Sequence, residues 1–144
     1  MPLPFARIGL AIAFALAAQG SAFAASLSAD EEVKVRSVIV AQLAAFAEDD
    51  ADKAFATATP AVREAIGNSG RFLAMVRGTY PMVYRPSAVT FLKPEGENGA
   101  AVQLVEITDG DAKSWLAMFV LEQQPDATWR INSCAVTENR WPST

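Results

Sequence analysis

Apolar positions in the first half of the chain recur at helical spacing. Steps of three or four residues link them, so they lie on one face of a helix: Val35, Val38, Ile39, Leu43 and Phe46. Ser28 and Glu31 precede this run at the spacing of a capping box, in which each side chain accepts a hydrogen bond from the other residue's backbone amide. The pattern predicts a long first helix that begins after Ser28 and ends near residues 48–49.

Three shorter helices are expected before residue 78. Asp50 is placed to cap a helix over residues 51–57, and Thr59 and Pro60 are placed to open a third helix that stops at Gly67. The Asn-Ser-Gly sequence at 68–70 is typical of a turn. After that turn the apolar spacing predicts a fourth helix over residues 71–77.

The second half of the chain is typical of β-strands. Runs rich in β-branched and aromatic residues predict strands at 89–92, 101–108, 114–122 and 129–137. Turn sequences separate them, and the Asn-Gly pair at 98–99 is a strong hairpin signal. Helices followed by a meander of strands predict an α+β fold, with N-terminal helices packed against a curved, four-stranded antiparallel sheet.

The predicted strand at 114–122 is apolar on both of its faces. Residues 115–121 do not alternate between apolar and polar, as they would if one face met water. Helices can cover one face, and the other then needs strong sheet curvature or a second subunit. The sequence therefore raises the hypothesis of a homodimer.

Residues 1–24 have the features of a secretory signal peptide. Arg7 supplies a positive charge, residues 8–18 form an unbroken apolar run, and the Ala-Phe-Ala sequence at 22–24 matches the motif that signal peptidase cleaves. Such a run is too short for a membrane-spanning helix, which needs roughly 20 residues. We therefore expect cleavage near Ala24, a periplasmic or secreted protein, and no stable membrane anchor after cleavage.

Cleavage at this point would leave residues 25–144, the size of a single α+β domain, with a core over about residues 28–138. Its only cysteine, Cys134, excludes an internal disulfide. The whole chain has 12 basic and 16 acidic residues, and loss of Arg7 gives 11 − 16 = −5. Because the basic residues are also scattered, the charge does not favour nucleic acid as a partner.

Several segments resemble a bacterial family known as domain of unknown function 4864. They are spread over residues 30–138 and comprise Gln42 to Phe46, Asp49 to Ala51, Ala54-Phe55, Phe72, Met75 to Arg77, Val83-Tyr-Arg-Pro86, Trp129-Arg-Ile131 and Cys134. That family is similar to the wider nuclear transport factor 2-like group, also called SnoaL-like or cystatin-like. The resemblance implies a cone-shaped fold with a pocket at its open end, and it implies no catalytic residues.

The residue types restrict the chemistry. The chain has no histidine, which removes the commonest general base and imidazole metal ligands, and no glycine-rich phosphate loop. We expect no cofactor and no metal. An enzyme would need a carboxylate base, either among Asp49, Asp50 and Asp52 or at Glu106. The three aspartates are typical of helix capping, and Glu106 is typical of an exposed strand end.

Five residues are candidates for lining a ligand pocket. Tyr80, Tyr84 and Arg85 lie between the last helix and the first strand, where Pro81 and Pro86 restrict the backbone. Gln103 and Trp115 are strand residues able to offer a hydrogen bond or an aromatic wall. The alternative for each is an ordinary packing role.

Cys134 has two interpretations. Strict alternation along the strand 129–137 places it on the same face as Arg130, whose charge could lower the pKa of the thiol. Without a histidine partner, however, a small buried core residue is the expected role.

The leading functional hypothesis is binding of a small, partly apolar ligand or of a protein partner. A cofactor-free enzyme that uses a carboxylate base in the pocket is the first alternative. A structural dimerisation module is the second.

Overall fold

The amphipathic segment after Ser28 forms the longest helix, α2 (Ala29–Ala47), in the computed structural model, which describes residues 26–143. The capping box is present, since the Ser28 hydroxyl accepts a hydrogen bond from the Glu31 amide at 3.1 Å. One face of the helix is buried and includes Val35, Ile39 and Phe46. The predicted signal peptide at 1–24 lies outside the described residues.

Four further helices follow α2: α3 (Ala51–Ala56), α4 (Pro60–Ile66), α5 (Ser69–Thr79) and α6 (Pro81–Tyr84). Asp50 and Thr59 cap α3 and α4 as predicted. The predicted turn at 68–70 is wrong, because Asn68 is itself an N-cap whose side chain accepts a hydrogen bond from the Arg71 amide at 2.8 Å. Helix α5 therefore begins earlier than the sequence indicates, and α6 was not predicted.

The strands are β1 (Ala88–Phe91), β2 (Glu95–Glu97), β3 (Ala100–Thr108), β4 (Ser114–Gln123) and β5 (Trp129–Glu138). They form an open antiparallel sheet in the order β1-β3-β4-β5, and β2 pairs with the other end of β3. The α+β class is confirmed, with five strands rather than the predicted four. The extra strand arises because Asn98 and Gly99, with φ values of 48° and 80°, fold β2 back onto β3.

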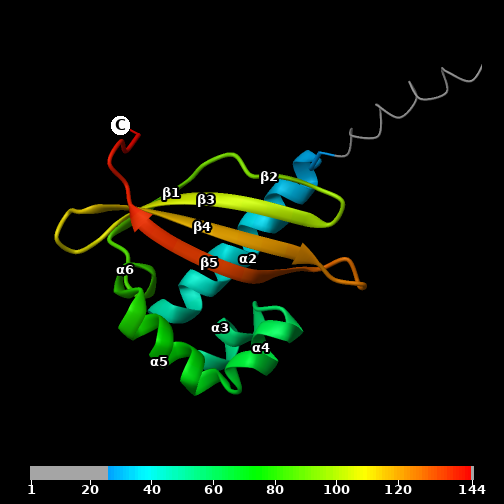
Figure 1. Ribbon diagram of the computed structural model, residues 1–144, viewed down its shortest axis with the longest axis horizontal. Helices are drawn as coiled ribbons and strands as arrows, with labels where there is room; N and C mark the ends of the chain where they lie inside the picture. Colours follow the sequence, from blue (N-terminus) through cyan, green and yellow to red (C-terminus); the bar gives the residue numbers. More distant parts are fainter. Residues whose placement is uncertain (1–25, 144) are drawn as a thin grey trace, which may run out of the picture.

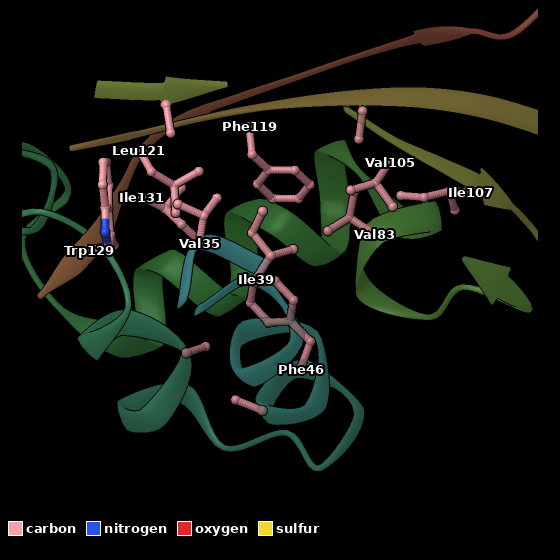
Figure 2. Packing of buried hydrophobic residues seen from close by; sticks show 14 of the residues in the cluster. Val35, Ile39, Phe46, Val83, Val105, Ile107, Phe119, Leu121, Trp129 and Ile131 are labelled. Atoms are coloured by element: carbon pink, nitrogen blue, oxygen red, sulfur yellow. The ribbon is translucent and has the colours of Figure 1, made fainter. Parts of the chain in front are cut away.

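All the described helices lie on one face of the sheet, and α2 runs across that face (Figure 1). The core lies between these two layers. Figure 2 shows Phe119 pointing from β4 toward Ile39 of α2, and both side chains are fully buried. Within residues 26–143, no helix is long and apolar enough to cross a membrane.

A β-bulge changes the alternation along β5. Val120 and Leu121 of β4 are consecutive, yet they pair with Ser133 and Ile131, so Asn132 is the extra residue. After the bulge, Cys134 pairs with Phe119 on the helix-facing side, whereas Arg130 pairs with Glu122. The predicted shared face of Cys134 and Arg130 is therefore wrong.

The opposite face of the sheet carries an apolar row that no described helix or strand covers, although Ser143 contacts Glu106 at one end of it. Leu104 pairs with Met118 and Val102 pairs with Val120, and Leu116 continues the row along β4. Met118 and Val102 are 41% and 39% exposed. Strand β4 thus has two apolar faces, as predicted, and the helices cover one of them. The homodimer that this pattern suggested stays a prediction.

Candidate ligand pocket

A pocket of about 380 Å³ opens between the helices and strand β5. Its wall is built from α2, α4, α5, α6 and β5, together with Ala58 in the link before α4. Most of its side chains are apolar, and they include Phe46, Val62, Ile66, Phe72, Met75 and Val76.

The link between α3 and α4 holds one side of the pocket open. Residues 57–59 pair with β5 at the bulge: the Thr59 amide donates to the Ile131 carbonyl at 3.0 Å, and the Ile131 amide donates to the Thr57 carbonyl at 2.7 Å. Helix α4 follows at once and has no fully buried residue of its own. Val62 and Ile66 of α4 then form part of the pocket wall.

Aromatic packing fixes the opposite side. The Phe72 ring of α5 lies 5.7 Å from the Phe55 ring of α3 and 5.8 Å from the Phe46 ring of α2, measured between centroids. Such tilted pairs are favourable beyond the area they bury. Helix α5 is thereby fixed against α2 and α3, and the pocket is the space that remains between α4, α5 and β5.

Two side-chain amides, Gln42 and Asn132, supply polarity to the pocket wall. Gln42 is 4% exposed, and its Nε2 donates to the Thr57 hydroxyl at 2.9 Å. That hydroxyl in turn donates to the Ala54 carbonyl at 2.7 Å. Asn132, at the bulge, accepts a hydrogen bond from the Thr59 hydroxyl at 3.3 Å. Each amide is therefore held in place by a hydrogen bond to a threonine hydroxyl.

The pocket wall carries no acidic or basic side chain among the residues that the structure describes. Cys134 lines it, and burial raises the pKa of this thiol to about 12. At neutral pH the thiol is protonated, and a protonated thiol is a poor nucleophile. This agrees with the predicted role of Cys134 as a small packing residue, although one side of it faces the pocket.

Of the five predicted pocket residues, Tyr80 lines the pocket and the other four lie outside its wall. Tyr84 and Arg85 meet Asp49 just beyond the end of α2. The Tyr84 hydroxyl donates to the Asp49 carboxylate, and Arg85 Nη2 lies 3.1 Å from it. The Tyr84 hydrogen bond, followed by the Arg85 charge, holds the pKa of Asp49 below its ordinary value. Arg85 also donates to the Phe46 carbonyl at 2.8 Å, so this cluster caps the end of α2.

Gln103 and Trp115 each hold a loop. Gln103 is fully buried, and its Nε2 donates to the carbonyls of Leu92 and Leu104 at 2.6 and 2.9 Å. Trp115 Nε1 donates to the Asp109 carboxylate at 2.8 Å, the contact that contributes most to lowering the pKa of Asp109.

The carboxylates considered as bases have other partners. Asp50 accepts a hydrogen bond from the Lys53 amide at 3.1 Å as the cap of α3, and Asp52 accepts one from the Ser69 hydroxyl at 2.6 Å. Glu106 lies on the outer face of β3 and accepts one from the Ser143 hydroxyl at 2.7 Å. Within the described part of the chain, no group of three or more acidic, cysteine or histidine side chains could hold a metal ion.

The sequence reasoning missed Gln42 and Asn132. A signal for Gln42 was present, because it stands three residues after Ile39 and four before Phe46, on the apolar stripe of α2. A polar residue at such a position needs a hydrogen-bonding partner. Asn132 gave no comparable signal, since its position depends on the bulge in β5.

Together, the fold and the pocket define an α+β domain with an uncharged, mainly apolar pocket at the junction of its helices and its last strand. Residues 28–144 match the family described as Domain of unknown function (DUF4864), so the chain belongs to this family. No curated protein and no solved structure matches the chain. Because the family description assigns no activity, function has to be argued from the pocket itself.

Proposed function

We propose that this protein binds a small, mostly apolar molecule in the pocket between α4, α5 and β5. The observation that carries the proposal is the pocket itself, whose volume of about 380 Å³ falls in the range of small-molecule sites. Its wall combines apolar and aromatic side chains with a few fixed polar groups, as such sites do. With the predicted signal peptide, the proposal becomes one of ligand binding in the periplasm or outside the cell.

The pocket chemistry favours binding over catalysis. A cofactor-free enzyme of the kind considered from the sequence needs a carboxylate base within reach of its substrate. None of the described side chains in the pocket wall is a carboxylate, and the Cys134 thiol is protonated. The described side chains of the pocket wall can hold a ligand, but none of them is a base that would take a proton from it.

We also propose that the domain belongs to the wider nuclear transport factor 2-like group. A long helix, α2, that crosses one face of an antiparallel sheet supports this, as does a pocket whose wall includes residues of that helix and of strand β5. A ligand-bound structure of a close relative would test this fold-group assignment, because it would show whether the ligand lies in the pocket that the group's fold implies.

A neutral fluorescent probe, N-phenyl-1-naphthylamine, tests the binding proposal, because its emission rises in apolar surroundings. We expect saturable binding of one probe per chain. Val76→Trp would fill the pocket and is expected to abolish binding, whereas Val40→Trp, on an exposed position of α2, is the matched control and keeps it. Equal binding by the Val76→Trp variant and the natural protein would show that the probe sits elsewhere.

A second proposal concerns the uncovered apolar face of the sheet, for which we propose a second copy of this chain as the partner. A two-fold dimer sets one patch against itself, and here the apolar row is bordered by the oppositely charged neighbours Glu122 and Arg130. After a two-fold rotation, each charge can meet its opposite.

Sedimentation velocity at micromolar concentration tests the dimer. We expect a dimer for the natural chain and a monomer for Met118→Glu, which puts a charge in the centre of the patch. Val33→Glu, on a 63% exposed position of α2, is the control and should remain a dimer. A natural chain that sediments as a monomer would refute the proposal.

A further inference from the structure

We infer that the pocket selects uncharged molecules that carry a hydroxyl or N–H group, and that this group donates a hydrogen bond to Oε1 of Gln42. The inference rests on the proposed function and adds the chemical class of the ligand. Alcohols, phenols and amides with an apolar body belong to that class.

The orientation of the Gln42 amide follows from its partner. The Thr57 hydroxyl has one proton, which it donates to the Ala54 carbonyl at 2.7 Å. It can therefore only accept from Gln42, at 2.9 Å, and the atom of Gln42 that donates has to be Nε2. The other end of the amide, the acceptor Oε1, is directed away from Thr57.

Gln42 Oε1 accepts no hydrogen bond from the described residues, although the residue is only 4% exposed and lines the pocket. The atom is not among the fully enclosed polar atoms that lack a partner, so it keeps some solvent exposure. A nearly enclosed acceptor that accepts no hydrogen bond from the protein is satisfied by water or by a ligand. The pocket is where a partner can reach Gln42. A ligand that donates there replaces water and satisfies the acceptor, whereas a ligand with no donor leaves it unpaired.

The same wall disfavours charged ligands. A carboxylate would bring its oxygens against the Oε1 acceptor and would find no arginine or lysine among the described wall residues. An ammonium group would lose its hydration without meeting a carboxylate. Transfer of either ion into an apolar pocket with no counter-charge is costly.

The test compares four probes with the same chain length: 1-octanol, its isomer heptyl methyl ether, octanoate and octylammonium. Each is titrated against bound N-phenyl-1-naphthylamine at pH 7. The alcohol and the ether differ chiefly in the ability to donate a hydrogen bond. We expect the alcohol to bind roughly three- to tenfold more tightly than the ether, and each ion roughly tenfold or more weakly than the alcohol.

Variants identify the acceptor. In Gln42→Met, which keeps the length of the side chain but removes the amide, the alcohol-to-ether preference should fall to about one. Gln103→Met is the matched control, because Gln103 is equally buried and lies outside the pocket wall, and it should keep the natural preference. Thr57→Val frees the Gln42 amide to rotate and should reduce the preference, whereas Thr57→Ser retains the hydroxyl and should keep it.

The outcomes separate the two proposals. Equal affinity of alcohol and ether in the natural protein would overturn the inference and leave ligand binding standing, as would tight binding of octanoate. A preference that Gln42→Met retains, or that only Gln103→Met removes, would also overturn it, because the acceptor would then be another group. If N-phenyl-1-naphthylamine does not bind, and direct titration of each of the four probes detects no binding either, both proposals fall.

Discussion

Alkylation of Cys134 by iodoacetamide offers the sharpest test of the pocket as described. The chain has one cysteine, so the reaction reports on a single site. Only the thiolate reacts, and burial raises the pKa of the Cys134 thiol from the ordinary 9.0 to about 12. We therefore expect the folded protein to react far more slowly than the same protein in denaturant.

The magnitude follows from ionisation. At pH 8 the thiolate fraction falls by a factor of about 10^(12 − 9), or about 1000, when the chain folds. A thiolate of higher pKa is intrinsically more nucleophilic, with a Brønsted coefficient of about 0.4–0.5, which returns at most a factor of about 30. The net slowing should therefore lie between about 30-fold and about 1000-fold.

The assay measures the pseudo-first-order rate by mass spectrometry from pH 7 to pH 11, with and without guanidinium chloride. In denaturant the rate should level off above pH 9, whereas in the folded protein it should still rise about tenfold per pH unit. Saturating 1-octanol should slow the folded reaction further, because Cys134 lines the pocket. A folded profile that levels off near pH 9, or equal rates in both states, would refute the reasoning.

Three more perturbations have defined outcomes. Because folding raises the Cys134 pKa, the free energy of unfolding should not depend on this thiol below pH 9. Between pH 9 and pH 12 it should fall by at most about 1.4 kcal/mol per pH unit. Chemical denaturation of Cys134→Ala should show no such loss. Tyr84→Phe should raise the Asp49 pKa measured by NMR and lower the melting temperature at pH 7, with the difference fading below pH 3.8. Gly96→Ala should cost about 1–3 kcal/mol in urea unfolding, since its Cβ would lie 2.2 Å from the Ala100 carbonyl oxygen.

The parts of the fold that depend on local chemistry were predictable from the sequence. Ser28, Asp50 and Thr59 start helices where the sequence places them, because an N-cap is decided by one side chain and the amides next to it. Asn68 has the same chemistry, but its Asn-Ser-Gly context is equally typical of a turn. The packing of Phe72 against α2 and α3 favours the helix there, together with the Asn68 cap.

Strand β2 was missed for a related reason. Its sequence, Glu-Gly-Glu, has poor strand propensity and no apolar alternation. It becomes a strand because the Asn98-Gly99 turn places it against the end of β3, and because Gly96 has no Cβ to meet the Ala100 backbone. The turn was predictable, but the pairing that it imposes depends on the partner strand.

The pocket was least accessible to sequence reasoning because its wall is set by the bulge in β5. Asn132 interrupts an alternation of inward-facing and outward-facing residues that otherwise looks regular along β5. The position of this interruption depends on the two partners of Ile131, which are Leu121 on β4 and residues 57–59 before α4. With strict alternation, Cys134 would lie beside Arg130 on the face of the sheet opposite to the helices. The bulge instead turns Cys134 into the pocket and leaves Arg130 next to Glu122.

This one irregularity therefore determines both the shape and the chemistry of the site. The pairing of residues 57–59 with β5 positions Thr57 next to Gln42 and Thr59 next to Asn132. Each amide of the pocket wall is thereby held by a hydrogen bond to a threonine hydroxyl. By rotating the rest of β5, the bulge places the protonated thiol of Cys134 where strict alternation would place Ser133. Under the proposed function, these fixed hydrogen-bonding groups would lose little entropy when a ligand binds, which favours discrimination among neutral molecules by their donors.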